Sequence, residues 1–89
     1  MFKATLANPE QCPNPAKLVE IELLPHEGGV ILGSEKRPSI KEFIRWLGKA
    51  GVKKEIDENT DGTVDFKFYT RVIGKRATWR LRKVYRLKP

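Results

Sequence analysis

The chain has 89 residues and a formal net charge of +7, with 39% hydrophobic and 33% charged residues. This length excludes a second domain, and the apolar residues recur in periodic runs that disordered segments lack. The single cysteine excludes an intramolecular disulfide, and we find neither a secretory signal nor the roughly 20 apolar residues of a membrane helix. We therefore predict one small folded domain over residues 1–89, located in the cytoplasm.

The charge is divided unevenly along the chain. The first 66 residues carry nine basic and eleven acidic side chains, whereas residues 67–89 carry nine basic ones and no acidic one. The two parts contribute −2 and +9 to the net charge. A cluster this dense must be solvated or matched by an anion, and polyanions such as nucleic acid are the commonest match.

The N-terminal part predicts a short strand, a loop and a hairpin. Phe2–Ala7 fits a short strand, and the prolines of Asn8–Ala16 favour a surface loop. In Leu18–Leu24 apolar residues alternate with acidic ones, which is typical of a half-buried strand. The loop Pro25–Gly29 then leads into a strand at Val30–Gly33.

A helix is predicted over Ser39–Ala50. Ser39 and Glu42 have the spacing of a capping box, and Gly51 is well placed to end the helix. Apolar residues at helical spacing predict its buried face. These residues are Ile40, Phe43, Ile44, Leu47 and Ala50, with Trp46 at the border.

The C-terminal half predicts a three-stranded antiparallel meander with strands at Val52–Glu58, Thr63–Ile73 and Ala77–Leu87. A three-residue loop, Thr60–Gly62, joins the first two strands, with its glycine in the left-handed conformation. The segment Gly74–Ala77 closes a tight turn between the last two strands.

These turns imply a register for both hairpins. The first hairpin places Ile56 beside Phe66 and Lys53 beside Tyr69. In the second, the predicted core pairs are Val72 with Trp79, Thr70 with Leu81, Phe66 with Tyr85 and Val64 with Leu87, and the turn sets Ile73 opposite Thr78.

Together the elements predict an α+β fold of two layers. Its antiparallel sheet combines the C-terminal meander with the N-terminal hairpin, and the helix packs on the apolar face. We expect the Leu18–Leu24 strand to help cover that face. A register shift of one residue would bury arginines, which is costly, so the register should be well specified.

The opposite face of the sheet collects basic residues around one aromatic ring. Arginine binds phosphate oxygens in bidentate fashion, and an aromatic ring stacks on an unpaired base. Arg71 and Arg80 would be cross-strand neighbours, which costs stability unless an anion bridges them. The predicted nucleic-acid-binding residues are Lys53, Lys67, Tyr69, Arg71, Arg80, Arg82 and Arg86.

We therefore expect a small protein that contacts the phosphate backbone of single-stranded DNA or RNA, because the basic surface is a sheet face and no helix-turn-helix pattern is found. One alternative is an accessory or inhibitor module, of a kind that viruses encode, which docks this face on an acidic protein surface. Another is a toxin-type ribonuclease, although that class places a helix first. The simplest alternative is a solvated face that opposes aggregation.

The segment 57–65 resembles the calcium loop of the EF-hand family, with a glycine at Gly62 and an apolar residue at Val64. The twelfth position of the pattern is Phe68, where the family has a bidentate glutamate, and the segment alternates like a strand. The matching oxygen-bearing residues are Asp57, Asn59, Asp61 and Asp65. The sequence favours a polar hairpin tip over a metal site.

Catalytic signatures are missing from the rest of the sequence. His26 stands alone in a glycine-rich turn, and Cys12 has no second cysteine or histidine nearby. Glu20 and Glu22 fit a solvated acidic strand face. We therefore predict a protein that is not an enzyme and that uses no cofactor or metal.

Overall fold

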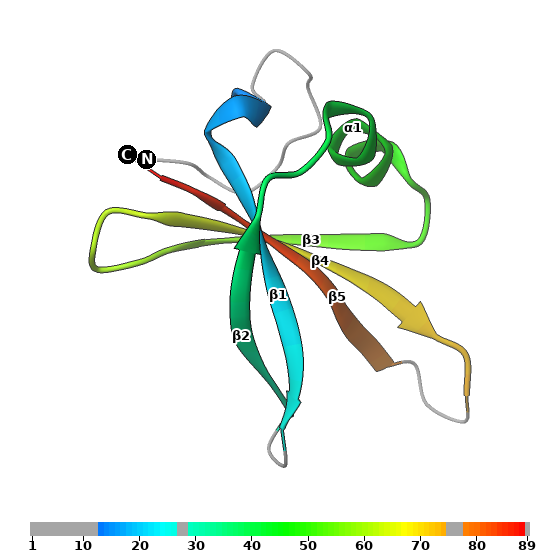
Figure 1. Cartoon of the computed structure of the whole chain (residues 1–89). Coiled ribbons are helices and arrows are strands. Elements are labelled where there is room, and N and C mark those ends of the chain that lie inside the picture. The colour runs from blue at the N-terminus through cyan, green and yellow to red at the C-terminus, as the bar shows by residue number, and fades with distance from the viewer. Residues whose placement is uncertain (1–12, 27–28, 75–77, 89) are drawn as a thin grey trace.

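The computed structural model describes residues 13–26, 29–74 and 78–88. Within these ranges it shows a five-stranded antiparallel sheet, one α-helix and a 3₁₀ turn, η2, at Pro15–Lys17 (Figure 1). The predicted α+β fold is confirmed. The strands are β1 (Leu18–His26), β2 (Gly29–Lys36), β3 (Val52–Glu58), β4 (Val64–Val72) and β5 (Thr78–Leu87), and the helix α1 spans Ile40–Gly48.

The strand order is β2-β1-β5-β4-β3, so the N-terminal hairpin joins the C-terminal meander edge to edge. The segment Leu18–Ile21 of β1 pairs with Val84–Leu87 of β5. The prediction that this strand covers the apolar face is therefore wrong. As a neighbour of β5, β1 satisfies backbone hydrogen-bonding groups that a covering strand would leave unpaired.

The first hairpin is longer than predicted, because β1 runs to His26 and β2 runs from Gly29 to Lys36. Its register shifts between Ile21 and Leu23, where β2 contains an extra residue. The predicted strand at Phe2–Ala7 lies outside the described residues.

The helix begins where the sequence predicts. The Ser39 Oγ accepts a hydrogen bond from the Glu42 backbone N–H at 3.1 Å, which satisfies one of the amide groups left free in the first turn. The helix ends at Gly48, before Gly51, which takes a positive φ of 76° in the turn to β3.

The buried face of α1 differs from the predicted one. Phe43 and Trp46 are buried, whereas Ile40 and Ile44 are 63% and 59% exposed. Two aromatic side chains remove more apolar surface from water than two isoleucines do, so they take the side facing the sheet. Leu47 is partly buried against the same core.

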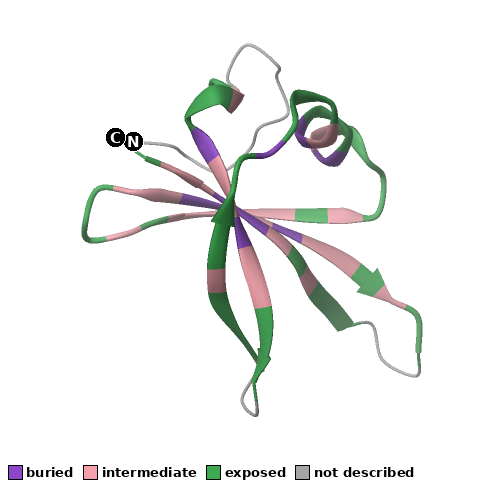
Figure 2. Cartoon of the chain, in the orientation of Figure 1, coloured by how far each residue is buried: buried purple, intermediate pink, exposed green. Residues whose placement is uncertain are grey.

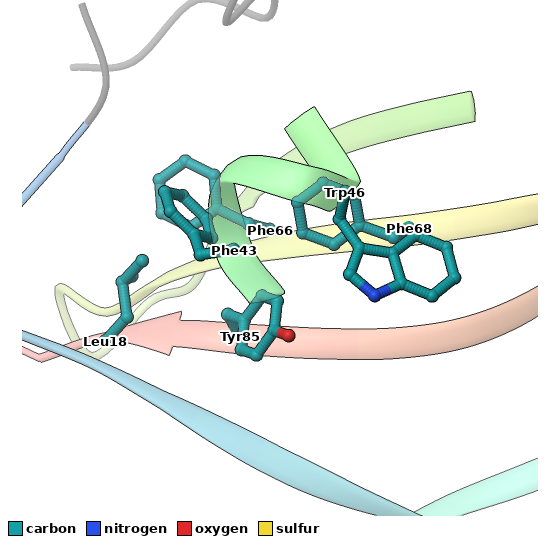
Figure 3. Close-up of a cluster of buried hydrophobic side chains, with 6 residues drawn as sticks. All are labelled: Leu18, Phe43, Trp46, Phe66, Phe68 and Tyr85. Carbon is teal, nitrogen blue, oxygen red and sulfur yellow. The ribbon is translucent and has the colours of Figure 1, made fainter. Parts of the chain in front are cut away.

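The core is an aromatic cluster between α1 and the centre of the sheet (Figure 3). The ring of Phe68 lies 5.6 Å from that of Tyr85 and 6.3 Å from that of Phe43, both edge to face. Phe43 and Tyr85 lie 5.7 Å apart. These are favourable geometries for aromatic pairs, and Leu18 and Phe66 complete the buried cluster.

An ion-pair cluster ties α1 to the sheet beside this core. The ammonium group of Lys83 on β5 contacts Glu42 of α1 and lies 3.4 Å from Glu20 of β1. Both Glu20 and Lys83 face α1, since their cross-strand partners are Tyr85 and Phe68 of the core. Glu20 is therefore part of the fold and not a free acidic face.

The β3–β4 hairpin follows the predicted register, with Ile56 opposite Phe66 and Lys53 opposite Tyr69. In its loop Gly62 has a φ of 86°, as expected for a left-handed residue. The register of β4 with β5 is also as predicted from Val64–Leu87 to Phe66–Tyr85.

Candidate functional site

The outer face of the sheet is the face turned away from α1. It contains the positions that alternate with the core residues Phe66 and Phe68 of β4. Cross-strand partners share a face, so Lys53 and Tyr69 lie together on it, as do Asp65 and Arg86. Five of the seven predicted site residues lie on this face: Lys53, Lys67, Tyr69, Arg71 and Arg86.

A β-bulge in β5 interrupts the predicted pairing. Phe68 faces Lys83 but Tyr69 faces Leu81, so Arg82 is an extra residue without a direct partner on β4. Beyond this point the register is shifted by one residue. The predicted pairs of Val72 with Trp79 and Thr70 with Leu81 are therefore wrong.

The shift moves side chains between the two faces. Arg71 is opposite Trp79, so this tryptophan and Leu81 lie on the outer face instead of in the core. Arg80 is opposite Thr70 on the face of α1, and it is therefore not the neighbour of Arg71. The bulge removes the repulsion between two adjacent arginines, so that predicted cost no longer argues for an anion.

Three of the predicted site residues form ion pairs with acidic side chains of the sheet. Lys67 Nζ lies 2.5 Å from Asp57 Oδ2, and Arg86 Nε lies 2.9 Å from Oδ1 of the buried Asp65. These carboxylates raise the pKa of both bases, chiefly through direct hydrogen bonds, so both stay charged. Lys53 Nζ lies 3.1 Å from Glu55 Oε1.

Tyr69 belongs to the same charge-balanced region. Its hydroxyl donates a hydrogen bond to Glu55 Oε2 at 3.1 Å, and the ammonium group of Lys53 lies 5.8 Å from its ring centre. Burial and then the hydrogen bond to Glu55 raise the pKa of Tyr69. Its hydroxyl and its charged neighbours are thus already engaged within the sheet.

The distal half of the β4–β5 hairpin is different. We call Thr70–Val72 together with Thr78–Arg82 the basic arm. Within the described part of the chain, Arg71, Arg80 and Arg82 are exposed and form no ion pair. The arm projects from the core, and its β5 side is mostly exposed whereas its β4 side is mostly half-buried (Figures 1 and 2).

Trp79 adds an aromatic surface to this arm. It is 44% exposed and is the cross-strand partner of Arg71. The exposure of Trp79 was not predicted from the sequence, because an unbroken alternation puts this residue on the core side. Lys83 gives no sign of the bulge, because it lies opposite Phe68, where the unbroken alternation also places it.

The hairpin tip that resembles a calcium loop is held together by its own hydrogen bonds. Asp61 Oδ1 accepts hydrogen bonds from the backbone N–H and the hydroxyl of Thr63 at 3.0 and 2.6 Å, which lower the pKa of Asp61. Asn59 Nδ2 donates to Thr63 Oγ1 at 2.9 Å. Among the described residues, no three histidine, cysteine or acidic side chains converge in a way that could hold a metal.

No family model, curated protein or solved structure matches this chain. Function must therefore be argued from the site itself. In the part of the chain that the structure describes, no helix has the length and apolar character needed to cross a membrane.

Proposed function

We propose that this protein binds single-stranded nucleic acid through the basic arm. Arg71, Arg80 and Arg82 would contact phosphates, and the exposed ring of Trp79 would stack on an unpaired base. The observation that carries the proposal is the contrast between these arginines, which lack ion pairs among the described residues, and Lys67 and Arg86, which have them. A guanidinium group that no carboxylate neutralises is available to an anion.

The remaining predicted site residues have a supporting role in this proposal. Lys53, Lys67, Tyr69 and Arg86 maintain the charge-balanced sheet from which the arm projects. We propose a binding protein and not an enzyme, so RNA incubated with the purified protein is expected to remain intact. The single cysteine favours a reducing compartment, and we propose the cytoplasm.

The test is fluorescence anisotropy with labelled single-stranded and duplex oligonucleotides over a series of salt concentrations. Binding to single strands should weaken with salt, because phosphate contacts release counterions. Replacing Arg71, Arg80 and Arg82 by glutamine should lower the affinity about tenfold or more. It should also reduce the slope of log K against log salt by about 2, since each contact contributes about 0.7.

A matched control removes the same charge elsewhere. Arg37, Lys41 and Arg45 are exposed at and near α1, and their replacement by glutamine also lowers the net charge by three. This control should bind nearly as well as the unchanged protein. Equal losses in both triple variants, or no binding at low salt, would contradict the proposal.

A protein partner is the second candidate, because the end of the hairpin also exposes apolar surface. Ile73 is 98% exposed and lies beyond β4, close in sequence to Arg71. Tryptophan and arginine are enriched in the energetic centres of protein interfaces, so an accessory or inhibitor module could dock this arm on an acidic protein surface. A stoichiometric partner that survives nuclease treatment in a pull-down, and is lost in the arm variant, would favour this candidate.

A further inference from the structure

A cleft separates the two hairpins that project from the core. Since β1 and β5 pair only over Leu18–Ile21, the hairpins diverge beyond that point (Figure 1). The cleft between them has a volume of about 290 Å³. One wall comes from Leu23, Pro25 and Val30, the other from Leu81–Lys83, and Trp46 of α1 closes the end.

The cleft combines apolar side chains with two basic ones, of which one is available to a ligand. Five of its seven described lining residues are leucine, proline, valine or tryptophan, and no described acidic residue lines it. Lys83 is already paired with Glu20 and Glu42. Arg82, by contrast, is exposed and forms no ion pair among the described residues.

The size of the cleft restricts its occupant. Sites for small molecules typically have volumes of about 300 to 1,000 Å³. At about 290 Å³ this cleft lies just below that range, so it suits one small planar group. Apolar side chains on both sides of a flat group are also how proteins hold a base removed from its stack. A nucleobase is a small planar group of this kind. The phosphate of the same nucleotide supplies a negative charge for the available cation.

The cleft is continuous with the basic arm. Arg82 is the bulged residue of β5, so it belongs both to the arm and to the cleft wall. Leu81, its neighbour in the arm, is the cross-strand partner of Tyr69 at the base of the arm. A strand of nucleic acid lying along the arm would thus place a phosphate at Arg82 and the adjoining base at the mouth of the cleft.

We propose that the cleft takes one unstacked base of single-stranded nucleic acid, with the phosphate of that nucleotide on Arg82. This inference rests on the proposed function. It adds a pocket that encloses one base, whereas the arm contacts phosphates and stacks a base on the exposed ring of Trp79. The two parts can therefore be tested separately.

The experiment compares a short oligothymidylate with an abasic oligomer of the same length and the same phosphates. Val30 lines the cleft and is exposed, so Val30→Gln places a longer, polar, uncharged side chain there. Ile31→Gln is the matched control, because Ile31 is equally exposed on the same strand but does not line the cleft. Urea unfolding should show that both variants stay folded.

Val30→Gln should weaken oligothymidylate binding about tenfold relative to Ile31→Gln, the loss expected for one base contact. The abasic oligomer should bind both variants and the unchanged protein alike. If oligothymidylate binds the two variants equally well, the cleft inference fails while the proposed function stands. If neither oligomer binds the unchanged protein, the proposed function fails.

Tryptophan emission gives a second measurement that does not depend on the variants of Val30. The chain has two tryptophans, so in Trp79→Phe the emission reports only Trp46 at the end of the cleft. Oligothymidylate should change this emission and the abasic oligomer should not. Equal changes with both oligomers, or a change produced only by an acidic peptide that contains phenylalanine, would overturn the inference.

Discussion

The hairpins β1–β2 and β4–β5 both project from the paired centre of the sheet, but they expose different kinds of side chain. The β1–β2 hairpin ends in an apolar arm, Leu23–His26 with Gly29–Leu32, whose exposed side chains are mostly aliphatic. The β4–β5 hairpin ends in the basic arm, with exposed arginines and Trp79. Both arms continue strands that meet at the paired centre of the sheet.

This comparison separates the residues that hold the fold from those available to a partner. We call the paired segments Leu18–Ile21, Val64–Phe68 and Lys83–Leu87 the stem. The stem supplies four of the six residues of the core cluster, Leu18, Phe66, Phe68 and Tyr85, and it contains the ion-paired bases Lys67, Lys83 and Arg86. Stability should therefore respond to changes in the stem, and binding should respond to changes in the basic arm.

The largest effect is expected for Phe68→Ala. Phe68 packs edge to face on Phe43 and Tyr85 in the stem, and its truncation should lower the free energy of unfolding by about 3 to 5 kcal/mol. Ile73→Ala, at a 98% exposed position beyond the arm, should change it by less than about 0.5 kcal/mol. Urea unfolding checks both, and similar losses would break the division between stem and arm.

A pair of arginine variants tests the same division with one residue type on one strand. Arg86→Met leaves the buried carboxylate of Asp65 without its ion partner, which should cost about 2 kcal/mol, less than for a fully buried pair because Arg86 is partly exposed. Arg82→Met should cost less than about 0.5 kcal/mol. Thermal or urea unfolding measures both losses of stability. A larger loss in Arg82→Met than in Arg86→Met would contradict the division between stem and arm.

The arms can be compared by binding. Trp79→Ala should weaken oligonucleotide binding about tenfold through lost base stacking. Ile31→Ala, at an equally exposed aliphatic position of the apolar arm, should leave the affinity unchanged. Anisotropy titrations measure both, and an equal loss would show that the basic arm has no special role.

The smallest effects are expected for the hydroxyl groups of the two tyrosines. Tyr85 is buried, and its hydroxyl has no hydrogen-bond partner among the described residues. Tyr85→Phe should therefore raise stability by about 1 kcal/mol, whereas Tyr69→Phe, which loses the bond to Glu55, should lower it by about 0.5 kcal/mol. Destabilisation by Tyr85→Phe would reveal an unseen partner of that hydroxyl.

The pH dependence gives a further check on Tyr85. Burial, followed by the charges of Glu42 and Glu20, raises the pKa of Tyr85 above its ordinary value of 10.0. A raised pKa in the folded state means that its contribution is complete below pH 10.0 and is lost as the pH rises through the folded-state pKa. Unfolding curves should show a shallower alkaline loss of stability in Tyr85→Phe.

Local chemistry determined much of the fold from sequence alone. The capping residues Ser39 and Glu42 set the start of α1, and Gly62 set the β3–β4 turn and hence the register of that hairpin. These features depend on residues a few positions apart, so they can be predicted from a short segment of sequence. The strong positive charge of residues 67–89 is likewise a property of the sequence.

Tertiary structure decided the rest, because it depends on competition between distant segments. Alternation alone could not locate the bulge at Arg82, which places Trp79 on the outer face and Arg80 on the other. Periodicity alone could not choose which apolar side of α1 packs on the sheet; the aromatic cluster chose Phe43 and Trp46. Ion pairing across strands then separated the neutralised bases of the stem from the arginines of the basic arm, since a carboxylate neutralises only the base that the fold brings beside it.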